Sequence, residues 1–157
     1  MEIMIIVLLL ASLLGVWILS VRRRLQTQEE NIRNAMHQTL VQLAAERDAL
    51  ERLMELLENA MDTDSFRRMK HSLEMVQNGT EAQLPEWVAE QQRELLNVQK
   101  KIAEISKTMP LLQTQETYQK YWKAAKSYGH MVETSGLIYN DSVESYNRTL
   151  HRIPDGI

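Results

Sequence analysis

The hydrophobic and polar positions of this chain change their pattern once, near residue 21. Residues 3–21 carry no charge and are mostly apolar, whereas beyond residue 32 apolar side chains recur every three or four positions between charged and amide groups. That recurrence places the apolar side chains on one face of a helix. The apolar run of 19 residues covers roughly 28 Å, close to the ~30 Å hydrocarbon core of a bilayer. The pattern therefore predicts one membrane-spanning helix followed by amphipathic helices.

Three arginines follow the apolar run directly. After Arg22, Arg23 and Arg24, neither proline nor glycine occurs before residue 61, and these two residues interrupt helices most strongly. We therefore expect the spanning helix to continue unbroken to Met61 as the first helix of the domain. This divides the chain into an anchor with its basic flank, residues 1–24, and a helical bundle domain, residues 25–157.

Capping and breaking residues predict where the later helices begin and end. An Asp-Thr-Asp-Ser cluster at residues 62–65 places the start of a short second helix near Ser65, and Asn78 with Gly79 ends it. After a linker at residues 79–85, Pro85 opens a third helix that ends just before Pro110. Pro154 ends the last helix. The predicted fold is all-α, with an N-terminal transmembrane helix continuous with a long helix in an antiparallel three- to four-helix bundle.

The last helix carries the most regular apolar stripe, and two glycines lie on it. Gly129 and Gly136 each cost about 1 kcal/mol in helix propensity, so we expect a neighbouring helix to approach closely at both. On the first helix, Arg47 occupies the one position of the stripe that should be apolar. The stripe of the last helix consists of Tyr118, Trp122, Ala125, Gly129, Val132, Gly136, Tyr139, Val143, Tyr146, Leu150 and Ile153.

The residues around the apolar run predict its orientation. Glu2 precedes the run, the arginines follow it, and the run lacks an Ala-x-Ala cleavage site, so we expect an uncleaved anchor. Under the positive-inside rule the arginines stay in the cytoplasm, which leaves a short N-terminus outside and the helical domain inside. Trp17 fits the aromatic belt at the inner interface. Ala11 and Gly15 form a small-x-x-x-small pair, which is either a dimerisation face or a chance occurrence.

Composition and charge exclude several functions. Helix-favouring residues dominate, with only five glycines and three prolines, which supports the all-α prediction. The chain has no cysteine, so it forms neither disulfides nor thiolate metal sites. Its net charge is −3 with both signs mixed along the chain, which argues against nucleic-acid binding.

The sequence contains no motif for catalysis or cofactor binding. The four histidines form neither an H-x-x-x-H nor an H-E-x-x-H pair, and there is no G-x-S-x-G sequence or phosphate-binding glycine loop. Glu51, Glu55 and Glu58 lie near Arg47 and Arg52, which predicts surface ion pairs. We therefore expect no enzymatic activity, no metal and no cofactor.

Three segments resemble the LemA family. The family's C-terminal signature, Y-N-x-x-V-x-x-Y-N…F-P, is similar to Tyr139, Asn140, Val143, Tyr146, Asn147 and Pro154. The N-A-W-x-Q-x-x-V-Q-L…D…L pattern after the family's anchor is similar to Asn34, Ala35, Gln38, Val41, Gln42, Leu43, Asp48 and Leu53. The family's Y-P-x-L…E-x-F segment is similar to Met109, Pro110, Leu112, Glu116 and Tyr118. The resemblance spans nearly the whole chain and is weakest between residues 63 and 105.

Four positions depart from the family pattern. Met36 replaces the usual tryptophan and Ile153 the usual phenylalanine. Gly129 and Gly136 stand where the family tends to have glutamate and arginine. The chain thus resembles a divergent LemA protein, which implies a bacterial protein with a single N-terminal anchor and a bundle of long antiparallel helices. No enzymatic activity is established for the family, so the resemblance implies class and location more than mechanism.

These observations favour a structural or interaction role, with three alternatives. The first is a scaffold or adaptor at the cytoplasmic face of the bacterial inner membrane, which contacts lipid through residues 3–21, associates with itself and binds an unidentified membrane or cytoplasmic protein. The second is an envelope-side anchored coiled-coil protein, as in the spanin-like lysis proteins of phages. The third is an accessory subunit of a membrane protease or transporter. Asn140 and Asn147 either hydrogen-bond across the bundle and fix its register, or form a partner surface.

Overall fold

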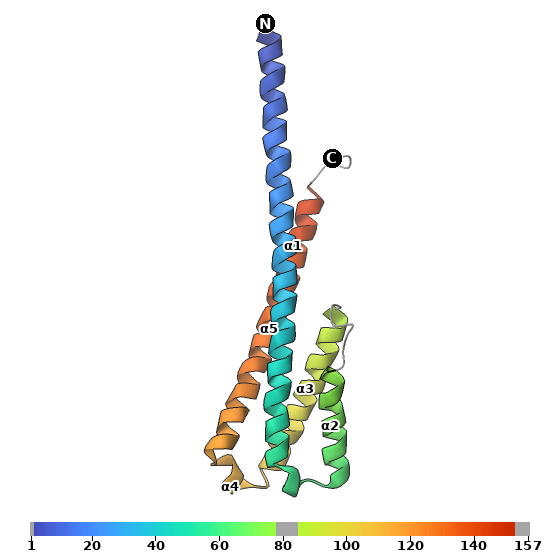
Figure 1. Cartoon of the computed structure of the whole chain (residues 1–157), viewed down its shortest axis with the longest axis vertical. Helices are drawn as coiled ribbons and strands as arrows, with labels where there is room; N and C mark the ends of the chain where they lie inside the picture. Colours follow the sequence, from blue (N-terminus) through green and yellow to red (C-terminus); the bar gives the residue numbers. More distant parts are fainter. Residues whose placement is uncertain (1, 78–84, 153–157) are drawn as a thin grey trace. The chain divides into compact units, whose positions relative to one another are not determined.

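The computed structural model describes residues 2–77 and 85–152. Among these residues there is no strand, so the predicted all-α class is confirmed. The predicted helix end at Asn78 and Gly79, the linker up to Pro85 and the helix stop at Pro154 lie outside the described residues. The elements are α1 (Glu2–Leu56), a 3-10 helix η1 (Glu58–Ala60), α2 (Thr63–Gln77), α3 (Pro85–Ser106), α4 (Pro110–Gln113) and α5 (Glu116–Leu150) (Figure 1).

The long helix α1 confirms that the apolar segment and the first bundle helix are continuous. It runs for 55 residues, because strong helix formers fill the segment after the arginines. The predicted end at Met61 is wrong: α1 ends at Leu56, and the chain tightens into η1 before it turns. The backbone N–H groups of Leu57 and Ala60 donate to the carbonyls of Met54 and Leu57 at 3.1 and 2.9 Å. These bonds span three residues, as in a 3-10 helix.

The predicted capping cluster starts α2. Asp62 Oδ1 accepts a hydrogen bond from the backbone N–H of Ser65 at 2.8 Å, which satisfies a donor of the first helical turn. Hydrogen bonds from the Ser65 side chain and backbone lower the pKa of the Asp62 carboxyl group. This cap places the start of α2 at Thr63, two residues before the predicted start near Ser65.

A proline explains the boundary between α3 and α4. The prediction ends the third helix just before Pro110, whereas α3 ends earlier, at Ser106. Met109, which precedes the proline, has φ −129° and ψ 71°. These angles lie outside the helical region, as expected for the residue before a proline. Pro110 then takes the first position of the single-turn helix α4.

The hydrophobic core lies within a compact unit formed by residues 36–137. In this unit the second half of α1, the helices α2 and α3, and the first half of α5 run alongside one another (Figure 1), and α2 contacts α3 directly. They enclose one apolar cluster, to which α4 adds a single side chain. The cluster consists of Leu43, Ala49, Leu50, Leu53, Met54, Leu57, Met69, Leu73, Val76, Val88, Leu95, Val98, Ile102, Leu112, Tyr118, Ala125 and Val132. The predicted helical bundle is therefore confirmed, with four helices around its core.

A second compact unit consists of residues 1–35 and 138–157. Its part of α1 includes a segment long and apolar enough to cross a membrane, and no residue of that apolar window is buried. Farther along, α1 runs antiparallel to the end of α5 (Figure 1), and Gln28 Nε2 donates a hydrogen bond to Ser145 Oγ at 2.9 Å. Trp17, Arg22, Arg23 and Arg24 are all exposed.

Leu53 provides a test of the bundle core. Its side chain is fully buried, so we expect Leu53→Ala to lower the free energy of unfolding by about 2–5 kcal/mol, through lost apolar contacts and the cavity left behind. Urea denaturation of the full chain in detergent micelles, followed by circular dichroism, measures this change. Leu111→Ala is the matched control, because Leu111 is 84% exposed and its loss should matter by less than about 0.5 kcal/mol. Equal effects of the two substitutions would contradict the assigned core.

Candidate functional site

Polar side chains meet inside the bundle where α1 faces α5. Ser135 Oγ on α5 donates a hydrogen bond to Gln42 Oε1 on α1 at 2.7 Å. One turn farther along α1, the fully buried Glu46 lies against Gly129 of α5. Gln42, Glu46, Gly129 and Ser135 are here termed the polar seam. The hydrogen bond within the seam favours one register, because its partly buried groups would lose their partners if the helices slid past each other.

Glu46 is the residue of the polar seam whose burial is least expected, because its side chain carries an ionisable carboxyl group. Its side chain is fully buried, and neither carboxylate oxygen has a hydrogen-bond partner among the described residues. Burial raises the pKa of Glu46 from its ordinary value of 4.5 to about 7, because surroundings of low polarity disfavour the charged form. The carboxyl group is therefore protonated at mildly acidic pH and becomes a buried, unpaired charge above neutral pH.

The glycine at position 129 makes room for this carboxyl group. A Cβ atom placed on Gly129 would lie 3.0 Å from Glu46 Oε1 and 3.3 Å from Glu46 Cδ, which is shorter than ordinary van der Waals contact. The predicted close approach at Gly129 is thus confirmed, and the approaching group is a side chain of α1. At Gly136 a Cβ atom would meet nothing within 4 Å. The predicted close approach at Gly136 is therefore wrong.

Glu46 is not singled out by the sequence pattern, because the apolar repeat of α1 is interrupted between Leu43 and Leu50. Either residue 46 or residue 47 fits the gap between them. The prediction places Arg47 on the stripe, whereas the structure buries Glu46 completely and leaves Arg47 half-buried. The gap in the repeat is the only signal in the sequence that points to Glu46.

Ion pairs on the surface of α1 follow the prediction in part. Arg52 Nη1 lies 3.0 Å from Glu55 Oε2, both groups being exposed, so the predicted pairing of Arg52 is confirmed. Arg47 pairs instead with Asp48, the next residue in the chain. Exposed pairs of this kind contribute little to stability, because water screens them.

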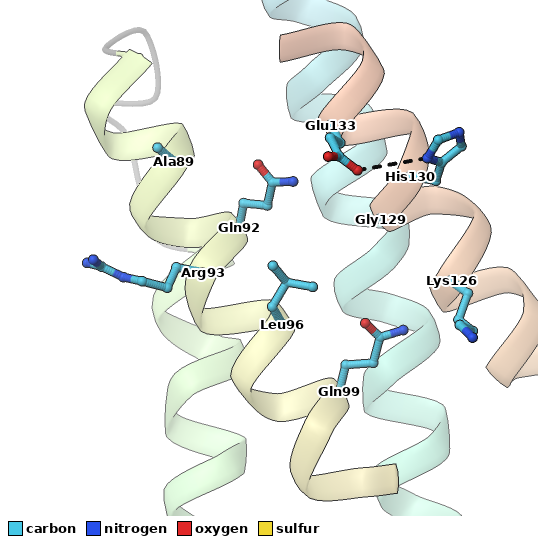
Figure 2. Close-up of a pocket in the computed structure, with 9 residues that line it drawn as sticks. All are labelled: Ala89, Gln92, Arg93, Leu96, Gln99, Lys126, Gly129, His130 and Glu133. Atoms are coloured by element: carbon cyan, nitrogen blue, oxygen red, sulfur yellow. Dashed lines mark ion pairs between the residues drawn. The ribbon is translucent and has the colours of Figure 1, made fainter. Parts of the chain in front are cut away.

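A surface pocket of about 470 Å³ lies between α3 and α5 beside the polar seam (Figure 2). Figure 2 shows side chains of α3 on one wall and of α5 on the other. Their charges are mixed, and His130 Nδ1 lies 3.9 Å from Glu133 Oε2. Within the part of the chain that the structure describes, no group of three or more His, Asp or Glu residues is placed to hold a metal ion. The pocket is lined by Ala89, Gln92, Arg93, Leu96, Gln99, Lys126, Gly129, His130 and Glu133.

The residues of the LemA-like motifs differ in how far they are buried and in whether they contact another helix. Gln42 takes part in the polar seam, and Pro110 begins α4. Pro154 lies outside the described residues. The exposed members are Asn34, Gln38, Asp48, Pro110, Asn140 and Asn147, and the half-buried members are Gln42, Tyr139, Val143 and Tyr146.

The prediction that Asn140 and Asn147 hydrogen-bond across the bundle is wrong, because both side chains are exposed. Each asparagine follows a half-buried tyrosine by one residue, which turns it about 100° around the helix and away from the packed face. Two serines of α5 instead make hydrogen bonds with α1, through the pairs Ser135 with Gln42 and Ser145 with Gln28. The alternative role of the two asparagines, as a partner surface, stays a prediction.

Comparison with known proteins adds no assignment. No protein-family model matches this chain, and neither a curated protein nor a solved structure matches it significantly. The fold and the site define a class: an all-α bundle that follows a helix apolar enough to cross a membrane. The resemblance to the LemA family stays a prediction that rests on the sequence motifs.

The raised pKa of Glu46 predicts a specific dependence of stability on pH. Because the pKa in the folded protein is about 7 and the ordinary value is 4.5, the folded state binds the proton more tightly than the unfolded state. This contribution to stability is complete at about pH 4.5, falls as the pH rises to about 7, and is then lost, a change of roughly 3 kcal/mol at most. Glu46→Gln should remove this pH-dependent contribution. The free energy of unfolding of the variant should therefore increase relative to that of the wild type as the pH rises.

Urea unfolding of the full chain in micelles, at several values between about pH 5 and pH 8, measures this difference. Glu90→Gln is the matched control, because it removes an exposed carboxyl group of α3. Parallel pH profiles for the wild type and Glu46→Gln would contradict a buried, unpaired carboxyl group.

The two glycines of α5 provide a paired test of the contact with Glu46. Gly136→Ala should stabilise the protein by about 0.5–1 kcal/mol, because alanine favours the helix and its methyl group meets open space. Gly129→Ala gains the same propensity but has to displace the buried Glu46, so we expect it to destabilise the protein by about 1 kcal/mol or more. In a Glu46→Ala background the obstacle is gone and Gly129→Ala should become stabilising. If thermal unfolding shows that Gly129→Ala stabilises the wild-type protein, the close contact is absent.

Proposed function

We propose that this protein is a membrane-anchored helical scaffold or adaptor of the LemA type, acting at the cytoplasmic face of the bacterial inner membrane. The observation that carries the proposal is the uncovered apolar surface of α1. Ile3, Leu8 and Leu13 are 79%, 65% and 67% exposed, and none of the apolar window is buried within the protein. Each such side chain gains about 1.5–3 kcal/mol when it leaves water. A bilayer provides a cover of matching length.

Apolar N-terminal helices also occur as core helices and as signal peptides, and neither role fits this segment as well. The core helix of a water-soluble bundle would be buried by its neighbours, and this segment is not. A secretory signal peptide has positive charge before its apolar run and a cleavage site after it. Here the arginines come after the run, and α1 continues as a helix to Leu56.

The exposed arginines support the proposed orientation. Arg22, Arg23 and Arg24 lie at the end of the apolar segment, and all three side chains are exposed. Positive residues close to a membrane segment favour the cytoplasmic side. The proposed topology therefore has the start of the apolar segment at the outer face of the membrane and the helical bundle in the cytoplasm.

The bundle itself supports binding rather than chemistry. In the polar seam, Glu46 has neither a nucleophile nor a base as a hydrogen-bond partner. The bundle also keeps large apolar side chains exposed, among them Val41, Met131 and Leu137, and exposed apolar surface is what partner helices cover. We assign these surfaces to a second copy of the chain and to a further membrane or cytoplasmic protein, while residues 3–21 contact lipid.

Crosslinking combined with a topology reporter tests this function. In membranes that contain the full chain, an amine-reactive crosslinker should yield dimers and larger species. A reporter fused after Ile157 should be active in the cytoplasm, and replacing Arg22, Arg23 and Arg24 with glutamine should lower that activity. Periplasmic reporter activity would contradict the orientation and favour the envelope-side alternative. A strictly monomeric protein that co-purifies with no partner would contradict the scaffold.

A further inference from the structure

The end of α5 lies level with the arginines of α1. Both segments belong to the same compact unit, and the hydrogen bond from Gln28 Nε2 to Ser145 Oγ sets their register. The two helices run antiparallel (Figure 1). Seven residues beyond Ser145 lies Arg152, and seven residues before Gln28 lies Val21. At about 1.5 Å per residue, each step covers roughly 10 Å, so Arg152 comes close to the level of Val21, where the apolar run ends.

Burial supports this pairing beyond the hydrogen bond. Thr149, one turn after Ser145, is buried. Leu25 and Val21, which lie one and two turns before Gln28, are half-buried, whereas Arg22, Arg23 and Arg24 between them are exposed. The side of α1 that carries Val21 and Leu25 is thus less exposed than the side that carries the arginines, as expected if α5 continues along it beyond the hydrogen bond of Ser145.

Basic side chains gather at this level from both helices. Arg148 and Arg152 of the α5 end are exposed, as are the three arginines of α1 and the neighbouring His151. Among the described residues of the α5 end, the nearest acidic group along the chain is Glu144, which lies 3.8 Å from Arg148 Nε. Five arginines lie at this end against Glu29, Glu30 and Glu144, so these described residues carry a net positive charge, whereas the whole chain has a net charge of −3.

We propose that Arg148 and Arg152, together with Arg22, Arg23 and Arg24, form a surface that binds the headgroups of anionic phospholipids. The inference rests on the proposed membrane anchor, because the end of residues 3–21 places these arginines at the headgroup level. Guanidinium groups bind phosphate oxygens with two parallel hydrogen bonds. An arginine within the ~8 Å Debye length of an anionic leaflet contributes about five-fold to lipid association. The end of α5 then rests on the leaflet beside α1.

Spin-labelled lipids test this surface on the full chain. The protein is reconstituted in phosphatidylcholine bilayers with a trace of spin-labelled phosphatidylglycerol or spin-labelled phosphatidylcholine, and electron paramagnetic resonance measures how much of each label the protein immobilises. We expect a preference for phosphatidylglycerol at low salt. The double variant R148Q/R152Q should lower this preference by about two-fold or more, since screening reduces the full effect of each charge.

Two further variants keep the result interpretable. R67Q/R68Q removes the same charge from exposed residues of α2 and should keep the wild-type preference. R148K/R152K keeps the charge and should keep most of the preference, even if the neutral substitutions loosen the end of α5.

The outcomes separate this inference from the proposed function. If neither lipid is immobilised, the membrane anchor itself is wrong. If both lipids are immobilised equally, the anchor holds and the headgroup surface is absent. A preference that R148Q/R152Q leaves unchanged, or that R67Q/R68Q lowers equally, would overturn the assignment to the α5 end and leave its arginines for an acidic protein partner.

Discussion

None of the described residues covers the apolar surface of residues 3–21, and the proposed membrane anchor depends on this constraint. In hydrocarbon every backbone N–H and C=O group has to be paired within the segment, which a helix achieves. The helix α1 satisfies this requirement and continues past the arginines without a break. One helix therefore supplies both an apolar segment long enough to cross a membrane and side chains of the bundle core, such as Leu50 and Leu53.

The bundle contains an apolar core, which supplies stability, and a few buried or partly buried polar groups, which affect how α1 and α5 align. Leucines and valines of the core supply stability through burial, whereas the hydrogen bond between Ser135 and Gln42 favours one register of α1 against α5. Glu46 lowers stability when it is ionised, and it is accommodated because Gly129 has no side chain. A carboxylate side chain at position 129 would stand against Glu46, because even a Cβ atom there would lie 3.0 Å from Glu46 Oε1.

Local signals account for the features that could be predicted from the sequence. The continuity of α1, the cap at Asp62 and the break in the helical pattern before Pro110 depend on residues next to one another in the chain, and the structure has all three. Apart from the ends of α1 and α3, which come a few residues earlier than predicted, the failures concern which way a side chain faces. Residues 46 and 47 both fit a gap in the apolar repeat, and only packing against Gly129 decides between them. The exposure of Asn140 and Asn147 and the open space at Gly136 likewise depend on neighbours that are distant in the chain.

The most direct test of the central claim is a spin-label scan of α1 in lipid bilayers. The chain has no cysteine, so single cysteines at successive positions from 5 to 24 can each carry one label, and its access to oxygen and to a water-soluble nickel chelate can be measured. If residues 3–21 span the bilayer, we expect high oxygen and low nickel access from residue 5 to about residue 19, with a change to nickel access near Arg22. Labels that are accessible to nickel throughout residues 5–19 would show a helix in water and contradict the account.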